Sequence, residues 1–205
     1  MMEVSLLNGD LTDEVTKTYL NSKYLSIDTE TTGLNPHRDK ICLVQICNED
    51  EIIYLIKDIG ENTPNLKKVL ENQTSTKIFH YARFDVTVLR HHLGIKVANP
   101  YCTKIASKLT RTYTDRHSLK HLVHEFFNIE LDKTCQTTDW SNPILTNEQI
   151  KYAANDVIYL KRMKDILDEK LERVNRKELA KKCFDFLETL VELDLKGWGS
   201  EIFSH

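Results

Sequence analysis

Carboxylate and phenol side chains gather in three separate segments of this sequence. An Asp-Thr-Glu triplet at 28–30 lies near the front, a His-to-Asp stretch at 80–85 lies in the middle, and Tyr152 and Asp156 come late. Hard divalent ions such as Mg²⁺ prefer oxygen ligands of this kind. Paired metal ions are a recurring device for phosphodiester hydrolysis. We therefore expect the three segments to meet in space and to hold two divalent metal ions.

The late segment is predicted to be helical. Thr146 and Gln149 have the spacing of a capping box, which closes the first turn of a helix. Apolar residues follow at helical spacing and predict one continuous helix over residues 150–171. Tyr152 and Asp156 are separated by one helical turn, so they share a face, with Cβ atoms roughly 5–6 Å apart.

Asp156 borders the apolar face of this predicted helix. A carboxylate there is costly unless it is paired, hydrogen-bonded or bound to metal. For this pair of residues alone, a surface carboxylate beside a half-buried tyrosine is the preferred interpretation. The other two acidic segments reverse that preference.

The front segment follows a predicted strand over residues 24–28. Alternation along the strand puts Asp28 and Glu30 on the same face, where they repel each other unless a cation lies between them. An exposed strand end that carries acidic residues is the alternative. Leu34 is apolar in the polar loop that comes next, and it either packs against the domain or wedges against a base beside the acidic pair.

The middle segment, residues 80–85, begins at the end of a predicted strand over residues 77–81. A helix is expected after it, from Val86 to Leu93. Asp85 therefore lies at a strand-to-helix junction. In open α/β folds this is the sheet edge where ligands bind. As the alternative, Asp85 simply caps the helix.

The segment from Thr103 to Lys120 is basic. It carries a charge of +4, although the whole chain carries −3. A solvated helix face is one interpretation, and a wall that contacts phosphate groups is the other. The negative net charge argues against a protein that coats long nucleic acid. It does not exclude a nuclease that acts on a short substrate, because bound metal ions would supply positive charge.

The remaining elements indicate one domain over residues 1–205. Strands are predicted at 4–7 and at 41–47 and 52–56, the last two as a hairpin. Further helices are predicted at 12–21, 65–71, 119–127 and 179–190. The tail, from about residue 191 to 205, contains Trp198 between two glycines and ends in further apolar residues. We expect it to fold back or to dock on another subunit.

The composition is that of an ordinary globular protein. Hydrophobic residues make up 40% of the 205 residues and charged residues 29%. The sequence shows neither a membrane-spanning apolar run nor a signal peptide, so we expect a cytoplasmic protein without a membrane partner. The five cysteines are scattered and form no CxxC pair, which favours reduced thiols over disulfides or a zinc site.

The three acidic segments together resemble the motifs of the DEDD exonucleases. They read D-T-E at 28–30, H-Y-A-R-F-D at 80–85 and Y-A-A-N-D at 152–156. The Y-x-x-x-D form marks the tyrosine subclass, because the histidine subclass would have a histidine where Lys151 stands. The T-D-W triplet at 138–140 and the run from Gln149 to Leu160 resemble the ribonuclease D branch.

The small, single-domain NrnC group within this family is a closer resemblance. The segments that carry it lie at 77–85, 102–120 and 193–198. The sequence after Trp140 is Ser-Asn-Pro-Ile-Leu, where ribonuclease D tends to have Arg-Pro-Leu. At 205 residues, the chain is also expected to be too short for the additional helical domains of ribonuclease D.

The resemblance implies a fold and an activity. The expected fold is an RNase H-like α/β domain with a mixed sheet flanked by helices. The expected activity is 3′-to-5′ hydrolysis of very short RNA, chiefly dinucleotides, to 5′-nucleoside monophosphates, with two Mg²⁺ or Mn²⁺ ions. Short DNA is a further candidate substrate. A ring-shaped homo-oligomer, an octamer, is also implied.

The resemblance assigns roles to the acidic residues. Asp28 would bridge both metal ions. Glu30 and Asp156 would bind the ion that carries the attacking water, and Asp85 would act on the other ion. Tyr152 would orient the water rather than serve as the main base, because an unperturbed phenol has a pKa of about 10.

Substrate contacts are expected on both sides of these acidic residues. A cap on a 5′-phosphate, placed one nucleotide from the metals, would exclude longer chains, and a neighbouring subunit would supply part of it. Four basic residues are the candidates for the cap: Lys104, Lys108, Arg111 and Arg116. The other expected contacts are Thr29, Leu34, His80 and Phe84.

Three alternatives remain. The first is a ribonuclease D-like trimmer of RNA 3′ ends or a general 3′-to-5′ exonuclease on DNA and RNA. The second is an inactive nuclease fold that serves as an RNA-binding scaffold, although such proteins usually lose metal carboxylates. The third is a calcium or regulatory metal site, which the absence of EF-hand loop spacing disfavours.

Overall fold

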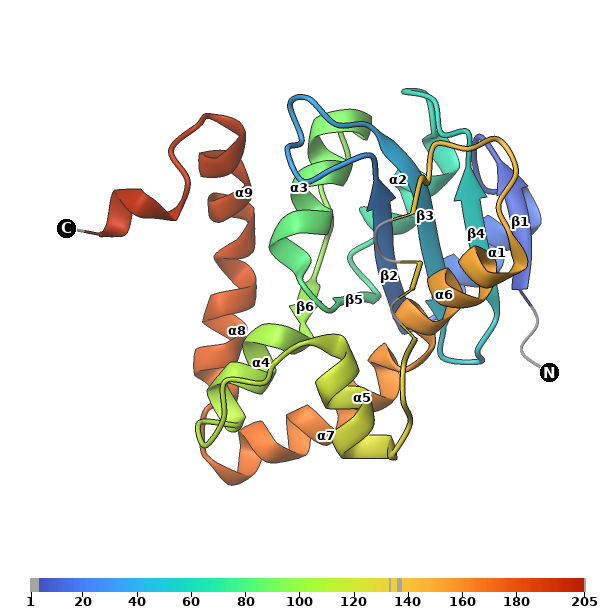
Figure 1. Cartoon of the computed structure of the whole chain (residues 1–205). Helices are drawn as coiled ribbons and strands as arrows, with labels where there is room; N and C mark the ends of the chain where they lie inside the picture. Colours follow the sequence, from blue (N-terminus) through green and yellow to red (C-terminus); the bar gives the residue numbers. More distant parts are fainter. Residues whose placement is uncertain (1–3, 133, 136–137, 205) are drawn as a thin grey trace.

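A six-stranded mixed sheet forms the centre of the computed structural model, which describes residues 4–132, 134–135 and 138–204 (Figure 1). The outermost residues of the predicted domain, 1–3 and 205, lie outside this description. In the sheet the order is β1-β4-β3-β2-β5-β6. The strands are β1 Val4–Asn8, β2 Tyr24–Thr31, β3 Ile41–Asn48, β4 Ile53–Lys57, β5 Thr76–Phe79 and β6 Pro100–Cys102.

Strand pairing confirms a mixed sheet. β3 pairs antiparallel with both β2 and β4, so the predicted hairpin is present. β1 lies parallel to β4, and β5 lies parallel to both β2 and β6. The sequence did not predict β6, which has only three residues.

Helices cover both faces of the sheet and extend beyond its β6 edge (Figure 1). Over the described residues none of them is long and apolar enough to cross a membrane. The helices are α1 Asp13–Asn21, α2 Pro64–Leu70, α3 Ala82–Leu93, α4 Thr103–Thr110, α5 Leu119–Phe127, α6 Asn147–Ile158, α7 Leu160–Arg173, α8 Lys177–Asp185 and α9 Leu187–Leu195, followed by a 3₁₀ turn, η1 Ser200–Phe203.

Two apolar clusters bury the two faces. On one face Leu25 and Ile27 of β2 pack in a cluster with residues of α1, α2, α3 and α7. On the other face Leu43 and Leu55 pack with the apolar side of α6. Figure 1 shows α6 crossing in front of the central strands, with α1 and α2 behind them. Alternation along β2 therefore sends successive side chains to α6 and to the opposite layer.

The predicted continuous helix over residues 150–171 is wrong, because the structure divides it at Tyr159 into α6 and α7. Val157 of α6 belongs to the smaller cluster, whereas Leu160 and Met163 of α7 belong to the larger one. A straight helix could not bury side chains in both clusters. The Tyr159 N–H bonds to the carbonyl of Val157 at the bend, and its ring stacks on Phe127 with centroids 5.8 Å apart.

The predicted helix over residues 179–190 is likewise divided, at Phe186, into α8 and α9. Both α8 and α9 contribute apolar residues to the larger cluster. They form the outer wall beside α3 and β6 (Figure 1). The tail then leaves the body, and the ring of Phe203 contacts Phe186 with centroids 5.7 Å apart.

Candidate active site

Three of the predicted carboxylates meet at the end of β2. Asp28, Glu30 and Asp156 each offer an oxygen atom, and these atoms all lie within 4.8 Å of one another. Asp28 and Glu30 come from the β2 face that α6 covers, as alternation predicts. Asp156 comes from α6, four residues after Tyr152. The capping box at Thr146 and Gln149 is present and fixes where α6 begins.

Asp85 reaches the site from the other layer. It is 3% exposed and accepts a hydrogen bond of 2.8 Å from the Thr29 hydroxyl. Thr29 points away from its neighbours Asp28 and Glu30 because side chains alternate along a strand. Helix α3 begins at Ala82 and its N-cap is Tyr81. Asp85 therefore lies within the first turn, and the interpretation of Asp85 as the helix cap is wrong.

Negative charge is concentrated in this site. Burial raises the pKa of Asp28 to about 7. Burial, followed by the charges of Asp28, Asp156 and Asp85, raises the pKa of Glu30 to about 10. Burial and the charge of Asp28 also raise the pKa of Asp85 well above its usual range. Without a cation, burial and mutual repulsion therefore favour the protonated forms of Glu30 and Asp85.

The donor set fits two divalent metal ions of the magnesium class. All four groups are carboxylates, which hard cations prefer, and their mutual repulsion is what a bound cation relieves. The Gln45 amide donates a hydrogen bond of 3.3 Å to Asp28 and holds that carboxylate from the neighbouring strand. The residues that would bind the metal ions are Asp28, Glu30, Asp85 and Asp156.

Tyr152 lines the site beside Trp140. Their ring centroids are 5.9 Å apart, and Trp140 is buried. Burial is the first cause that raises the pKa of Tyr152, and the charge of Asp156 is the second. The phenol therefore keeps its proton over the physiological range. It can donate a hydrogen bond to a water molecule, but it is a poor base.

The loop after β2 presents Leu34 to solvent, with 82% of its surface exposed. The Asp39 carboxylate holds the loop: it accepts hydrogen bonds of 2.9 Å from the Asn35 N–H and 2.8 Å from the Arg38 side chain. A Cβ atom on Gly33 would collide with the Asp39 carboxylate. A larger residue would displace the Asp39 carboxylate, so Gly33 allows the loop to close around Asp39.

His80 and Lys104 connect the middle segment to the start of α4. Nδ1 of His80 lies 2.9 Å from the Thr103 hydroxyl. The Lys104 ammonium lies 4.4 Å from the centre of the Tyr81 ring. These contacts hold both residues at the mouth of the acidic site.

A cleft of about 640 Å³ contains the acidic site. The predicted residues Thr29, Leu34, His80, Phe84 and Lys104 line it together with three of the carboxylates and Tyr152. Its other lining residues are Thr31, Thr32, Gly33, Tyr81, Ser118, Leu119, Lys120, Leu131, Asp132, Thr138 and Trp140.

Three of the predicted phosphate contacts lie outside this cleft. Lys108 is exposed on α4, and Arg111 and Arg116 line a separate hollow. The Arg111 side chain is 1% exposed and forms an ion pair with Glu125. It also donates hydrogen bonds of 3.0 Å to the Ser107 hydroxyl and 2.7 Å to the Arg116 carbonyl. Arg111 thus braces the turn between α4 and α5 in this chain.

The sequence reasoning assigned no site role to several residues that line the cleft or support it. Tyr81 lies within a recognised motif and Trp140 within another, so motif membership could have indicated both. Lys120 belongs to the basic segment and lies one residue after Leu119 at the start of α5. Gln45 had no sequence signal, because its pairing with Asp28 depends on the register of β2 and β3.

A family model described as 3′-5′ exonuclease matches residues 5–172. The chain therefore belongs to the 3′-5′ exonuclease family. DNA polymerase I of Aquifex aeolicus is 35% identical over 89% of this chain and 33% of its own length. Ribonuclease D of Bartonella henselae is 32% identical over 78% of this chain and 39% of its own length. The chain thus spans well under half the length of these curated relatives.

Some solved structures are similar to this chain over its full length. Brucella melitensis NrnC bound to pGG is 45% identical, with a TM-score of 0.93 and coverage of 100% of both chains. The same protein with bound Mg²⁺ is 44% identical, with a TM-score of 0.92 and the same coverage. These similarities place the chain in the ribonuclease D-like branch, near NrnC.

Proposed function

We propose that this chain hydrolyses very short RNA, chiefly dinucleotides, from the 3′ end and releases 5′-nucleoside monophosphates. The observation that carries the proposal is the convergence of carboxylates from β2 and α6 at one cleft of limited size, with Asp85 of α3 held beside them by Thr29. That cleft, of about 640 Å³, falls in the usual range for small-ligand sites. A dinucleotide suits such a site better than a long strand does.

The comparisons support the same substrate class. The Brucella NrnC structure with pGG contains a ligand of dinucleotide size, and that protein is similar to this chain over the full length of both. A net charge of −3 is also unlike that of proteins that grip long nucleic acid through a basic surface.

The residues of the cleft have separable tasks in this proposal. Asp28, Glu30, Asp85 and Asp156 hold the metal ions. When bound, divalent ions lower the pKa of a coordinated water and neutralise charge on the phosphate. Tyr152 keeps its proton and donates a hydrogen bond that orients the attacking water. Leu34, exposed at the cleft, packs against a base of the substrate.

Lys104 is the best-placed candidate for a phosphate contact, because it lines the cleft, whereas Lys108 of the same helix does not. Lys104→Ala should weaken binding of a 5′-phosphorylated dinucleotide about tenfold, the scale expected for losing one hydrogen bond to a charged group. The matched control Lys108→Ala should change the dissociation constant less than twofold. Equal effects of the two substitutions would remove Lys104 from this role.

Degradation of 5′-labelled RNA of different lengths tests the function. Wild-type protein and Asp28→Ala are incubated with Mg²⁺ and RNA of two, three, seven and about twenty nucleotides. Fast loss of the dinucleotide, slow loss of the others and no loss with Asp28→Ala is the expected pattern. Progressive shortening of every length would instead favour a general exonuclease or a ribonuclease D-like trimmer. Bound but uncut RNA of every length would favour a scaffold.

We also infer that the chain assembles with copies of itself, as an octameric ring. Support comes from the tail, where Trp198, Ile202 and Phe203 are 61%, 50% and 63% exposed. Exposed apolar side chains so close together are typical of surfaces that another protein covers. Sedimentation equilibrium should give eight chains per particle. A variant with Trp198→Ser and Phe203→Ser should give smaller particles, and an unchanged mass would exclude the tail from the contact.

A further inference from the structure

Arg83, in the first turn of α3, forms a two-pronged ion pair with Asp194 near the end of α9. Its Nε donates to Oδ2 at 2.7 Å and its Nη2 donates to Oδ1 at 2.6 Å. The two side chains are only 27% and 19% exposed. Two parallel hydrogen bonds fix the relative orientation of both groups as well as their distance.

The first turn of α3 begins without a capping side chain. Its N-cap residue, Tyr81, makes no side-chain hydrogen bond to the turn. Capping side chains ordinarily satisfy the free N–H groups at a helix start and fix the first residue of the helix. Contacts with residues distant in the sequence, Thr29 and Asp194, therefore contribute to holding this turn.

The three residues at this turn face three different partners. Arg83 contacts α9, Phe84 lines the cleft, and Asp85 accepts the hydrogen bond from Thr29. Consecutive side chains on a helix point about 100° apart, so a rotation or shift of the turn displaces all three together. Whatever fixes Arg83 therefore also fixes Phe84 and Asp85.

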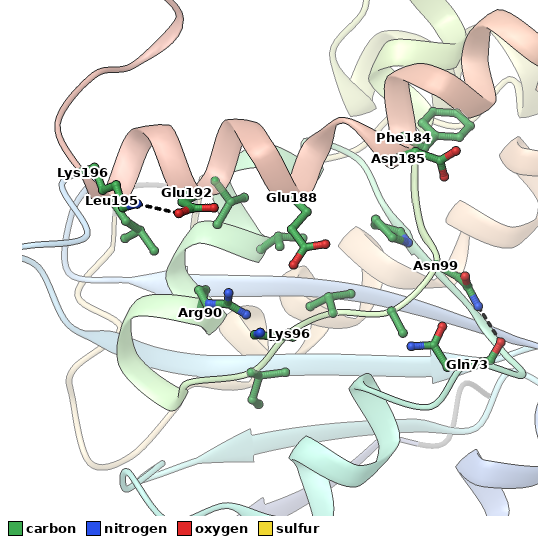
Figure 2. A pocket seen from close by; sticks show the side chains of 16 residues that line it. Gln73, Arg90, Lys96, Asn99, Phe184, Asp185, Glu188, Glu192, Leu195 and Lys196 are labelled. Carbon is green, nitrogen blue, oxygen red and sulfur yellow. Dashed lines mark hydrogen bonds and ion pairs between the residues drawn. The ribbon is translucent and has the colours of Figure 1, made fainter.

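A groove of about 760 Å³ lies beside the packed boundary of α3 and α9, with Arg90 of α3 and Glu188 of α9 on opposite walls (Figure 2). Among the described residues, Arg83–Asp194 is the only ion pair between the two helices. The pair thus fastens them at the end nearest the cleft.

A smaller hollow connects the ion pair to the cleft. Arg83 and Asp194 line this hollow of about 400 Å³ together with Leu34, Tyr81 and Phe84. The last three residues also line the cleft. The ion pair therefore lies directly behind the residues that would contact substrate.

We propose that Arg83 and Asp194 are positioning residues for catalysis: their ion pair fixes the first turn of α3, so that Phe84 keeps its place in the cleft and Asp85 keeps its hydrogen bond with Thr29. Helix α9 is then a support of the active site as well as a structural wall. The inference rests on the proposed nuclease function for its kinetic consequences. Neither residue contacts substrate or metal in this scheme.

Asp194→Asn is the main test variant, because it keeps the shape of the side chain and removes its charge. Arg83→Gln and the double variant complete a cycle that measures whether the two residues act as a unit. Glu192→Gln is the matched control, since Glu192 lies on the same helix and pairs with Lys196 through side chains that are 62% and 64% exposed. Asp194→Glu tests rescue by a conservative change.

Turnover of the dinucleotide by Asp194→Asn should fall about tenfold, because small displacements of catalytic groups lower the rate of reaction strongly. The KM of this variant should stay within about threefold of the wild-type value, since the ion pair does not contact the substrate. The double variant should be no slower than the slower of the two single variants. Asp194→Glu should recover most of the turnover, and Glu192→Gln should have the turnover of the wild type. Wild-type turnover in folded Asp194→Asn, with only a lower Tm, would overturn the proposal.

Amide hydrogen exchange at residues 81–86 gives a readout that needs no activity. Exchange there should be faster in Asp194→Asn than in wild type or Glu192→Gln, while exchange in α6 stays unchanged. Equal exchange at residues 81–86 in Asp194→Asn and Glu192→Gln would overturn the inference. A wild-type protein that cleaves no RNA would refute the proposed function, and the exchange result would still decide whether the pair holds the turn.

Discussion

Helices α6 and α3 each bring one carboxylate to the metal site, but their starting turns are fixed in different ways. Thr146 accepts a hydrogen bond of 3.2 Å from the Gln149 N–H, and the Gln149 side chain accepts one of 3.0 Å from the Thr146 N–H. The first turn of α6 is thus closed by residues of its own sequence. The first turn of α3 has no capping side chain and depends on partners from β2 and α9.

The two helices also approach β2 from opposite layers. Asp156 of α6 joins Asp28 and Glu30 in one tight group, whereas Asp85 of α3 is held by Thr29 on the opposite face. The comparison suggests that the α6 half of the site is assembled by local sequence and the α3 half by tertiary contacts. Substitutions in the two halves should therefore differ in what they disturb.

The largest effects should come from substitution of the carboxylates themselves. The loss of activity should be equal for the α6 half and the α3 half of the site. Asp156→Asn and Asp85→Asn should each slow dinucleotide hydrolysis by about 10³-fold or more, because metal ions contribute several kcal/mol of transition-state stabilisation. Initial rates at saturating Mg²⁺ provide the measurement. Asp165→Asn, an exposed carboxylate of α7, is the control and should leave the rate unchanged. A much smaller loss for Asp85→Asn would mean that the α3 half is dispensable.

Tyr152→Phe should lower the turnover about ten- to a hundredfold, which is less than the loss of a metal ligand. The phenol stays protonated because burial and the nearby charge of Asp156 raise its pKa. The pH profile of the variant should therefore keep the wild-type shape at a lower level. A profile that loses its alkaline or acidic limb would show that the phenol titrates during catalysis.

Stability of the metal-free protein should fall as the pH rises. Asp28 has a raised pKa in the folded state, about 7 against an ordinary 3.8, so its favourable contribution is complete below about pH 4 and is lost as the pH approaches 7. Glu30 extends the same trend to higher pH. Added Mg²⁺ should therefore raise the Tm by several degrees more at pH 8 than at pH 5, measured by calorimetry. Asp28→Asn should reduce this difference, and an equal Mg²⁺ effect at both pH values would contradict the electrostatic description.

The sequence predicts the α6 half of the site well, because a capping box, a helical apolar pattern and an i, i+4 pair are all local signals. It also predicts the pairing of Asp28 with Glu30, because alternation in a strand is local. Asp85 is found from its motif, but the residues that hold it are not. Arg83 and Asp194 are 111 positions apart, and no local pattern connects them.

The errors in the predicted helices have a related origin. The apolar repeat continues through Tyr159, so the sequence alone indicates one helix there. The bend arises because α6 and α7 bury their residues in different clusters, which only the assembled sheet defines. Arg111 is a similar case, since its charge suggested a phosphate contact and its burial against Glu125 depends on how α4 and α5 pack.

The smallest effect should come from the local support of α6. Thr146→Ala removes the hydroxyl of the capping box and should lower the free energy of unfolding by about 1 kcal/mol. Turnover should stay within about twofold of wild type at temperatures well below the Tm, because the later turns of α6 remain packed on the sheet. Denaturant unfolding and initial rates provide the two measurements. A tenfold loss of turnover would make the start of α6 as critical as the start of α3.

Metal stoichiometry tests most directly whether the two halves form one site. Mn²⁺, followed by the electron paramagnetic resonance signal of the free ion, can be titrated into protein that holds a non-cleavable dinucleotide. We expect two Mn²⁺ ions per chain in wild type and fewer in both Asp85→Asn and Asp156→Asn. Two ions bound with undiminished affinity in either variant would contradict a shared metal site built from β2, α3 and α6.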